Sequence, residues 1–436
     1  MNQLEFKRRR KALMQEVGKG NIALIASASV QTRNRDVTFP FRQDSDFYYL
    51  TGFNEADALA VFIPGREQGE YILFCQEFDE KKALWEGAHA GLEGATEHYD
   101  ADDSFPIDDM DDILSGLLEN KNKVFYPMGR DSELDHQILE WINHLKRQSR
   151  NGVNAPGELV SLEHVLHEMR LFKSAAELKL MRKAADVSCK AHARAMQQCK
   201  PGMYEYQVEG SIVSEFMQNG LRFVAYPSIV AGGKNACVLH YVENTDKLKK
   251  GDLLLIDAGV ECDHYASDIT RTFPVSGKFS PAQKQLYQLV LDAQTAALSQ
   301  IKPGIPWNHA HEQSVEVLTK GLVKLGLLKG PVSKLIKDEK YKQFYMHRIG
   351  HWLGMDVHDV GDYKVDDEWR LLEPGMVLTI EPGLYIPENC ESVEAKWRGI
   401  GIRIEDDVLV TKDGYEILTE SLVKEVDDIE KLMQAT

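Results

Sequence analysis

The first 170 residues alternate between stretches whose apolar positions suit helices and stretches that suit strands. Apolar residues recur at helical spacing from Leu4 to Val17. Other runs are rich in β-branched and aromatic residues, which is typical of strands. We therefore expect helices at 4–17, 113–120 and 133–147, the last capped by Asp131 and Ser132, and strands at 22–28, 47–50 with 58–63, and 71–76. This pattern predicts a mixed α/β unit.

A second unit begins near Lys173, where Ser174 is placed to cap a long helix. That helix extends to Gln198 and ends before Pro201-Gly202. The pattern then predicts helices at 204–218, 282–301 and 309–325, and strands at 224–230, 253–260, 265–275, 377–381 and 400–411. Two helices with strands are thus followed by two helices with strands, without obvious sequence repetition. We expect a site where these two halves meet.

Composition and charge narrow the class of protein. The chain has 436 residues, of which 43% are hydrophobic, and a net charge of −17. This length suggests two or three domains with a sizeable core, and it excludes a disordered, collagen-like or small disulfide-stapled protein. The negative balance argues against nucleic acid and anionic membrane as partners, because both attract clustered Lys and Arg. The one basic run, 7–11, is interpreted as a solvated helix face.

The six cysteines show neither a CxxC pair nor a regular spacing. We therefore expect neither a zinc finger nor a disulfide framework, and a reducing compartment fits this usage. The charged N-terminus is not followed by an apolar stretch, and no run approaches the roughly 18 apolar residues of a membrane span. Together these features predict a cytoplasmic protein.

Two aspartates stand where burial is costly. Asp257 ends the run Leu-Leu-Leu-Ile, whose continuous apolar residues are typical of a buried strand. A buried ionised carboxylate without a partner costs several kcal/mol, so Asp257 needs a metal ion, an arginine or a proton. A hairpin that turns about Cys262-Asp263 would place Asp268 directly opposite Asp257. Like charges so placed repel one another, so this arrangement favours cations between them.

Three more residues extend the pattern. Glu381 follows Val-Leu-Thr-Ile and Glu405 follows Gly-Ile-Gly-Ile-Arg-Ile, so both acids end apolar strands. His351 has glycine and aromatic neighbours, which predict a loop with close backbone approach. Singly, each acid has an alternative as a turn former or salt-bridge partner, and the histidine as a packed core residue. Four acids with one imidazole instead favour Mn²⁺, Co²⁺, Fe²⁺ or Zn²⁺, and their charge of −4 favours a centre of two divalent ions.

Longer motifs surround these residues. They are His-Arg-Ile-Gly-His-Trp-Leu-Gly-Met-Asp-Val-His-Asp-Val-Gly at 347–361, Leu-Glu-Pro-Gly-Met-Val-Leu-Thr-Ile-Glu-Pro-Gly-Leu-Tyr at 372–385, and Gly-Ile-Arg-Ile-Glu-Asp-Asp at 401–407. In this order and context the five residues resemble the ligand set of the pita-bread metallopeptidases. That family includes methionine aminopeptidase, prolidase and aminopeptidase P.

The resemblance extends to the N-terminal unit. Residues 39–55, Phe-Pro-Phe-Arg-Gln-Asp-Ser-Asp-Phe-Tyr-Tyr-Leu-Thr-Gly-Phe-Asn-Glu, are similar to the N-domain motif of bacterial aminopeptidase P. Residues 167–174, His-Glu-Met-Arg-Leu-Phe-Lys-Ser, resemble its interdomain joint. The implied fold is α/β (α+β), with a creatinase-like or aminopeptidase P-like mixed α/β domain at 1–172 and a pita-bread catalytic domain at 173–436.

The resemblance also implies an activity: hydrolysis of the first peptide bond of a peptide whose second residue is proline. Two metal ions would be held by Asp257, Asp268, His351, Glu381 and Glu405, with Mn²⁺ as the first choice and Co²⁺ or Zn²⁺ as alternatives. A hydroxide shared by the metals would attack the scissile carbonyl, while Glu381 both binds metal and handles the proton of the water. His240 and His358 would lie beside the substrate, with His358 stabilising the carbonyl oxygen or developing charge.

Further residues are assigned to substrate binding by the same resemblance. His347 would flank the proline pocket, and Tyr226 and Tyr385 would border the metal site, unless they simply pack in the core. Arg403 would orient a ligand carboxylate, or else close a structural ion pair. Trp85 resembles a tryptophan that relatives contribute to a neighbouring subunit's pocket.

One departure and several alternatives accompany this interpretation. Arg348 stands where close bacterial relatives often carry small or apolar residues, so we expect it to affect the preferred peptide length. The second hypothesis is a prolidase, limited to Xaa-Pro dipeptides, and the third is a pita-bread binding module without catalysis. The resemblance further implies a homo-oligomer, either a dimer or a tetramer.

Overall fold

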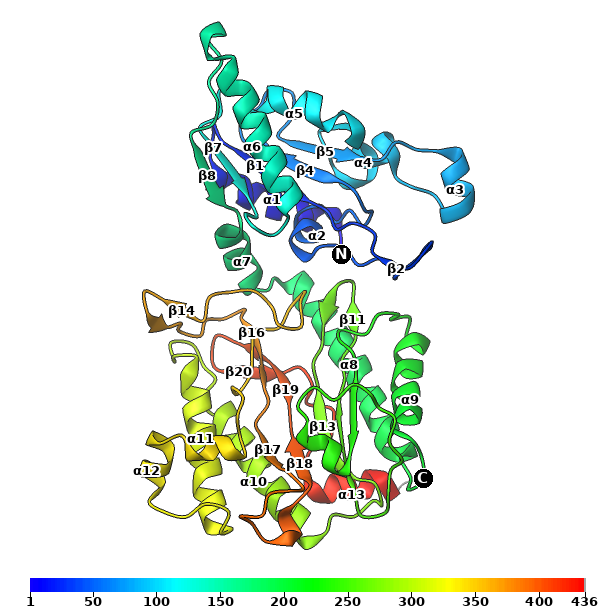
Figure 1. The fold of residues 1–436 in the computed structure, drawn as a ribbon, viewed down its shortest axis with the longest axis vertical. Helices are drawn as coiled ribbons and strands as arrows, with labels where there is room; N and C mark the ends of the chain where they lie inside the picture. Colours follow the sequence, from blue (N-terminus) through cyan, green and yellow to red (C-terminus); the bar gives the residue numbers. More distant parts are fainter. Residues whose placement is uncertain (435–436) are drawn as a thin grey trace. The chain divides into compact units, whose positions relative to one another are not determined.

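The computed structural model describes residues 1–434 and contains two compact units (Figure 1). The first unit ends at Met169 and the second begins at Arg170, whereas the sequence placed the boundary between residues 172 and 173. Arg170 and Lys173 therefore both belong to the second unit.

The first unit is built on a six-stranded mixed sheet in the order β6-β5-β4-β1-β7-β8. Helices α5 and α6 pack their apolar residues on this sheet, and Asp131 caps α6 as predicted. The strands are β1 (Ile22–Ala26), β4 (Leu59–Phe62), β5 (Tyr71–Cys75), β6 (Asp103–Pro106), β7 (Lys123–Tyr126) and β8 (Glu158–Ser161), with a separate hairpin of β2 (Thr32–Asn34) and β3 (Val37–Thr38). The helices are α1 (Gln3–Val17), α2 (Ser45–Thr51), α3 (Glu80–Glu86), α4 (Gly91–Tyr99), α5 (Met110–Leu118) and α6 (Ser132–Arg147), and α7 (Glu163–Leu171) begins in this unit and includes the first residues of the second.

One predicted strand of this unit is wrong. Residues 47–50 belong to helix α2. Asp44 caps that helix by accepting a hydrogen bond from the Phe47 N–H, at 2.9 Å, and Gly52 ends it in a left-handed conformation. Every residue of α2 is buried, so its sequence shows no amphipathic period that distinguishes a short helix from a buried strand.

The second unit contains two successive sets of helices and strands, which confirms the predicted layout. In the first set, α8 packs on α9, and the three-stranded sheet has the order β13-β10-β9. In the second set, α10 packs on α11, beside the sheets β16-β19-β20 and β17-β18. Figure 1 shows the strands of this unit with α9 on one side and α11 on the other.

The elements of the first set are α8 (Ala175–Gln198), α9 (Glu205–Gln218), β9 (Ile229–Gly232), β10 (Leu253–Asp257), β11 (Glu261–Cys262), β12 (Tyr265–Ala266) and β13 (Thr270–Pro274). Those of the second set are α10 (Pro281–Leu298), α11 (Asn308–Lys324), α12 (Val332–Lys337), β14 (Lys364–Val365), β15 (Glu368–Trp369), β16 (Val377–Ile380), β17 (Gly383–Ile386), β18 (Ile400–Arg403), β19 (Asp406–Val410), β20 (Tyr415–Ile417) and α13 (Val426–Gln434). Helix α8 begins with the capping box that Ser174 predicts.

The hairpin that carries Asp257 and Asp268 differs from prediction by two residues. Its tip is Asp263-His264, and both residues have positive φ, at 52° and 69°. Such angles are typical of a type I′ turn, although the sequence lacks the usual Asn-Gly. Asp257 pairs with Thr270, not with Asp268. Because side chains alternate with a period of two, this shift leaves both aspartates on the same face of the hairpin.

Two further features concern the whole of the described chain. None of the helices within residues 1–434 is long and apolar enough to cross a membrane. All six cysteines lie in this range and are free thiols.

Candidate metal centre and active site

Antiparallel strand pairs bring the four acids together two at a time. The hairpin formed by β10 to β13 presents Asp257 at the end of β10 and Asp268 just before β13. In the other half, β16 pairs with β19 so that Ile380 faces Asp406, which places Glu381 and Glu405 at the adjoining positions. The two halves are joined here by the Glu405 N–H, which donates to the Thr270 carbonyl at 3.0 Å. The site therefore lies where the halves meet, as the repeated layout predicts.

The His351 loop is held against β16 by its backbone. A Cβ atom at Gly350 would lie 1.9 Å from the Thr379 carbonyl oxygen, which confirms the close approach predicted for this loop. The His351 N–H donates to Thr379 Oγ1 at 3.1 Å. Its Nδ1 lies 2.9 Å from the Trp352 carbonyl oxygen, so Nδ1 carries the proton of that bond and Nε2 faces the acids.

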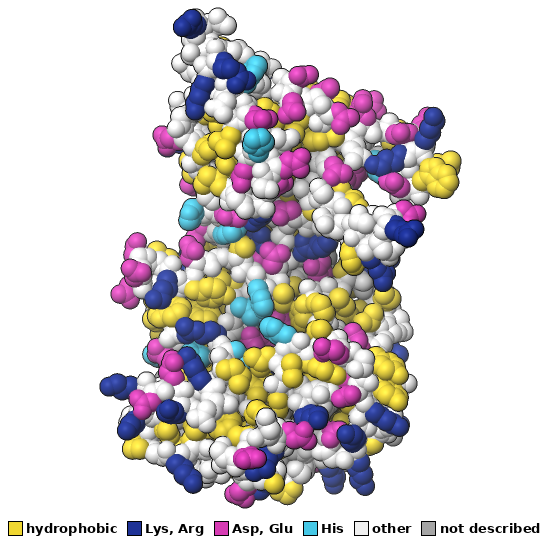
Figure 2. All heavy atoms as spheres, viewed as in Figure 1, with side chains coloured by type: hydrophobic (Ala, Val, Ile, Leu, Met, Phe, Trp, Pro, Cys, Tyr) yellow, Lys and Arg dark blue, Asp and Glu magenta, His cyan; other side chains and the backbone are white. Residues whose placement is uncertain are grey.

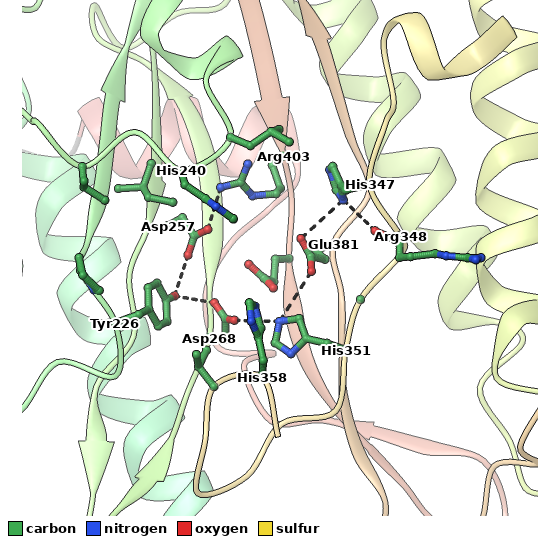
Figure 3. Close-up of a pocket in the computed structure, with 17 residues that line it drawn as sticks. Tyr226, His240, Asp257, Asp268, His347, Arg348, His351, His358, Glu381 and Arg403 are labelled. Atoms are coloured by element: carbon green, nitrogen blue, oxygen red, sulfur yellow. Dashed lines mark hydrogen bonds and ion pairs between the residues drawn. The ribbon is translucent and has the colours of Figure 1, made fainter. Parts of the chain in front are cut away.

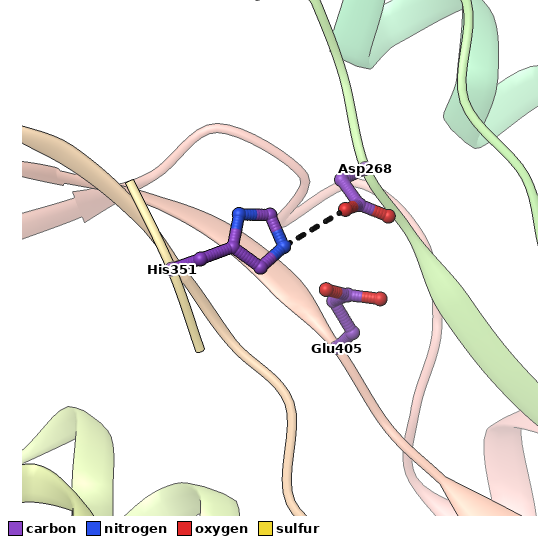
Figure 4. A group of neighbouring side chains, drawn as sticks. All are labelled: Asp268, His351 and Glu405. Atoms are coloured by element: carbon purple, nitrogen blue, oxygen red, sulfur yellow. Dashed lines mark ion pairs between the residues drawn. The ribbon is translucent and has the colours of Figure 1, made fainter. Parts of the chain in front are cut away.

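Three donors form the tightest group of the site (Figure 4). Ligand atoms of Asp268, His351 and Glu405 all lie within 4.8 Å of one another. His351 Nε2 is 3.3 Å from Asp268 Oδ2 and 3.7 Å from Glu381 Oε1. Carboxylate oxygens with one imidazole are a suitable donor set for a divalent first-row metal.

The electrostatics of these donors also fit a cation. Burial, reinforced by Asp268, raises the pKa of Glu405 well above its ordinary value. Burial likewise raises the pKa of Glu381 to about 7, although His351 and Arg403 oppose that change. Burial disfavours a charged His351, yet Asp268 and Glu381 outweigh it and raise the pKa of the imidazole to about 9. Without a metal, Glu381 and Glu405 thus favour protons that divalent ions would replace.

Asp257 is held by two partners, Tyr226 and Arg403 (Figure 3). The Tyr226 hydroxyl lies 2.7 Å from Asp257 Oδ1 and 2.5 Å from Asp268 Oδ1, so its single proton is shared between two carboxylates. Burial raises the pKa of Tyr226 well above 10, which keeps that proton in place. Arg403 Nη2 donates to Asp257 Oδ2 at 2.7 Å. This single contact both orients the carboxylate and forms an ion pair, so the two alternatives given for Arg403 coincide.

The donors open into a cavity of about 500 Å³ that three further histidines line. His358 packs edge-on against His351, with ring centres 4.3 Å apart. His240 lies in an exposed turn after β9. His347 Nε2 is 2.9 Å from the Tyr385 hydroxyl, and burial, with Arg403 nearby, lowers the pKa of His347 to about 3, so its ring is neutral. Figure 2 shows histidines gathered on this face between hydrophobic side chains.

Tyr385, Trp85 and Arg348, which were also singled out from the sequence, lie in three different settings. Tyr385 is buried behind the cavity wall, and its hydroxyl accepts a hydrogen bond from Arg403 Nη1 at 3.0 Å. Trp85 belongs to α3 in the first unit and is 86% exposed. Arg348 lines the cavity, but its side chain extends away from the acids (Figure 3) and binds Asn308 Oδ1 at 2.9 Å.

Some residues of the candidate site were not predicted from the sequence. Thr270 donates to Glu405 Oε2 at 2.6 Å and accepts from Arg403 Nε at 3.1 Å. Asp407 accepts hydrogen bonds from the Asp268 N–H. The sequence feature that could have identified Thr270 is its position two residues after Asp268, because side chains at this spacing lie on the same face of a strand. The cavity wall also includes unpredicted apolar residues: Pro227, Ile229, Leu239, Val242 and Val357.

Comparison with known proteins identifies the family. The model of metallopeptidase family M24 matches residues 179–412, and that of the aminopeptidase P N-terminal domain matches residues 6–126. The chain belongs to metallopeptidase family M24. The family resemblance, the N-terminal domain type and the pita-bread fold inferred from the sequence are thereby confirmed.

Individual M24 proteins match over nearly the whole chain. The Xaa-Pro aminopeptidase of Escherichia coli (strain K12) is 44% identical over 432 residues, which are 99% of this chain and 98% of that relative. The solved structure of Pseudomonas aeruginosa aminopeptidase PepP is 55% identical with a TM-score of 0.99, and the match covers 100% of this chain and 98% of that one. Aminopeptidase P from E. coli with the inhibitor Pro-Leu has a TM-score of 0.96 at 43% identity, and the match covers 100% of this chain and 99% of that one.

Proposed function

We propose that this M24 protein is a dinuclear-metal Xaa-Pro aminopeptidase, which removes the first residue from peptides with proline in second position. The observation that carries the proposal is the convergence of five metal-binding side chains on one cavity in a chain that matches Xaa-Pro aminopeptidases over nearly its full length. In this proposal the second residue of the peptide lies beside His347, whose ring is neutral.

We assign two divalent ions to Asp257, Asp268, His351, Glu381 and Glu405. The donor set is hard and carries four carboxylates, which supports Mn²⁺ as the native ion, with Co²⁺ or Zn²⁺ as substitutes. When bound, such ions lower the pKa of a water molecule and polarise the scissile carbonyl. The side chains of this protein bind the peptide and move its protons.

Glu381 is the residue we assign to proton transfer from the attacking water. Its Oε1 is 3.7 Å from His351 Nε2 and its Oε2 is 3.9 Å from His347 Nδ1, so the carboxylate stands between the donor group and the proline side of the cavity. A carboxylate in this position lies within reach of both a water molecule among the donors and the leaving side of the peptide, so it can accept a proton and return it.

The nitrogen that leaves is a proline nitrogen, which has no N–H in the peptide and must be protonated to depart. His358 and His240 are the cavity histidines we assign to the reacting bond, with His358 stabilising the charge that develops on the carbonyl oxygen. Burial and His351 lower the pKa of His358, so its ring is neutral and has one N–H to donate.

Substrate binding falls to His347, Arg403, Tyr226 and Tyr385. Tyr385 acts through His347 and Arg403, because its hydroxyl bonds both and its ring is buried. Arg403 holds Asp257, while Tyr226 holds Asp257 and Asp268, so both fix ligand carboxylates as well as one wall of the cavity.

We also propose a homo-oligomer, either a dimer or a tetramer, in the cytoplasm. Trp85 and its neighbour Leu84 are 86% and 85% exposed, which supports a role for this part of α3 at a subunit contact that supplies Trp85 to a neighbouring pocket. Six free thiols support a reducing compartment. Light scattering during size-exclusion chromatography of the wild type and of Trp85→Ala tests the assembly, and a monomeric wild type would contradict it.

The activity is tested with a peptide panel varied in length and in the second residue. The metal-free protein is assayed after addition of Mn²⁺, Co²⁺ or Zn²⁺. We expect cleavage of the first bond in Xaa-Pro-Xaa and longer peptides, and little cleavage when alanine replaces proline. Cleavage of Xaa-Pro dipeptides alone would identify a prolidase instead, and no hydrolysis with any ion would identify a binding module.

A further inference from the structure

Backbone hydrogen bonds close the loop that carries His358 and attach it to β12. The Asp359 N–H donates to the Trp352 carbonyl at 2.9 Å, and the Ala266 N–H donates to the Gly354 carbonyl at 2.8 Å. Within the described residues, no hydrogen bond holds the His358 ring itself; its close neighbour is the His351 ring, 4.3 Å away between centres. The position of this imidazole therefore depends on how the loop is fixed.

Asp359, next to His358, is fixed by two buried cations. Its Oδ1 accepts from Arg170 Nη2 at 2.6 Å, and its Oδ2 accepts from Lys173 Nζ at 2.9 Å. All three side chains are at most 2% exposed. A Cβ at Gly354 would lie 2.1 Å from Asp359 Oδ2, so the loop folds tightly over the carboxylate.

Arg170 also binds the other end of the turn, at Asp356. Arg170 Nη2 also binds Asp356 Oδ2 at 2.7 Å, so one guanidinium binds both carboxylates that bracket His358. The cations are themselves anchored, because the Lys173 N–H donates to the Gly375 carbonyl at 2.9 Å and Ser174 starts α8 with a capping box. The motif at 167–174, which the proposed function leaves without a role, thus reaches the active-site loop.

The charge arrangement favours a role in geometry over one in stability. Replacing a buried ion pair by apolar residues of similar volume is often neutral or stabilising, so such a pair is weak evidence of stabilisation. A carboxylate whose two oxygens bind separate cations is held in one orientation. This also restricts the position of the backbone that carries it. A displacement of about 1 Å in a catalytic group is enough to cost about 10²-fold in rate.

We propose that Asp359, clamped between Arg170 and Lys173, is a positioning residue that fixes the His358 imidazole beside the metal centre. The inference rests on the role proposed above for His358. Asp359 and the two cations touch no reacting atom, and they act through the loop.

The kinetic test is a double-mutant cycle. Asp359→Asn and Lys173→Met are made alone and in a His358→Ala background, and Xaa-Pro-Xaa hydrolysis is measured with two equivalents of metal bound. We expect each single variant to lower kcat by about tenfold or more with KM changed by less than about twofold, and to have less than about a twofold effect when His358 is absent. The same fold loss in both backgrounds would overturn the proposal. Lys173→Met serves if Asp359→Asn does not fold.

A second readout needs no activity. Protein labelled with ¹³C at histidine Cε1 and loaded with Zn²⁺ gives a His358 signal that is assigned by its loss in His358→Ala. We expect Lys173→Met to shift or broaden this signal while the exposed His136 signal stays in place. The matched control, Glu416→Gln, breaks the exposed Arg182 ion pair and should move neither. An unchanged His358 signal in Lys173→Met would overturn the proposal. If His358→Ala keeps wild-type turnover, the proposed function of His358 fails, and this spectrum alone decides whether the clamp positions the ring.

Discussion

At the scale of single residues, the candidate metal centre has too little positive charge to balance its carboxylates. Tyr226 offers one proton to Asp257 and Asp268, and Arg403 binds the other oxygen of Asp257. Among the described residues, Glu405 receives a side-chain hydrogen bond only from Thr270. The four carboxylates that line the cavity, together with Arg403, have a formal charge of −3, and a largely desolvated site stabilises such a charge only with cations or protons.

Removing one acid should therefore remove metal. We expect Asp257→Ala to bind less than two equivalents of metal and to lose hydrolysis, because the remaining donors no longer balance two divalent ions. Elemental analysis after gel filtration measures the metal. The exposed Asp413→Ala is the matched control and should keep two equivalents. Two equivalents bound to Asp257→Ala would refute its assignment as a ligand.

His358 should affect turnover but not metal content. We expect His358→Ala to keep two equivalents of metal and to lower kcat by roughly 10²–10⁴, since it would remove a group that donates to developing charge. Steady-state kinetics on an Xaa-Pro-Xaa peptide, with the exposed His136→Ala as control, measure the effect. Wild-type turnover would exclude His358 from the mechanism.

At the scale of elements, strand pairing is the part that the sequence only partly predicts. The acids at the ends of apolar strands identify Asp257, Glu381 and Glu405, because burial makes a carboxylate there conspicuous. The register of the Asp257 hairpin is not predicted, since a turn at Asp263-His264 requires two non-glycine residues with positive φ. Helix α2 is missed because complete burial removes the period that distinguishes it. Thr270 and Asp407 become visible only once the register is known.

The register itself predicts the effect of a single methyl group. A Cβ at Gly259 would lie 1.8 Å from the Ser267 carbonyl oxygen across the hairpin. We expect Gly259→Ala to lower the free energy of unfolding by about 1–3 kcal/mol, through the overpacking it causes. The control is Gly210→Ala on α9, where a Cβ meets no atom within 4 Å. Because alanine is favoured over glycine inside a helix, we expect this change to raise the free energy of unfolding by about 0.5–1 kcal/mol. Denaturant unfolding measures both, and equal effects would contradict the register.

The Asp359 clamp should contribute stability that depends on pH. Burial opposes ionisation, but Lys173 and Arg170 outweigh it and hold the pKa of Asp359 below its ordinary value. A depressed folded pKa stabilises the protein above the unfolded pKa, near 4, and that contribution is lost as the pH falls through the folded value. We expect the difference in unfolding free energy between wild type and Asp359→Asn to be constant from pH 7 to about 5 and to shrink below about 4. A difference that grows on acidification would contradict the sign.

At the scale of the whole molecule, the repeated layout of helices and strands explains why one site holds donors so far apart in the sequence. Each half supplies one pair of acids from antiparallel strands, and the Glu405 N–H joins the halves at the Thr270 carbonyl. The motifs near residues 351, 381 and 405 predict this convergence, because they fall at strand ends and in a glycine-rich loop. The excess of acids in the composition is mostly unrelated to the site, where four of the 68 acidic residues carry the proposed chemistry.

The most direct test of the account is a metal titration of the metal-free protein during hydrolysis of one Xaa-Pro-Xaa tripeptide. Mn²⁺ is added in fractions of an equivalent, and release of the first residue is followed by mass spectrometry. We predict that the rate rises until two equivalents are bound and that the products are the free first residue and Pro-Xaa. A rate that is independent of metal, a plateau at one equivalent, or an uncut tripeptide beside a hydrolysed Xaa-Pro dipeptide would contradict a dinuclear Xaa-Pro aminopeptidase.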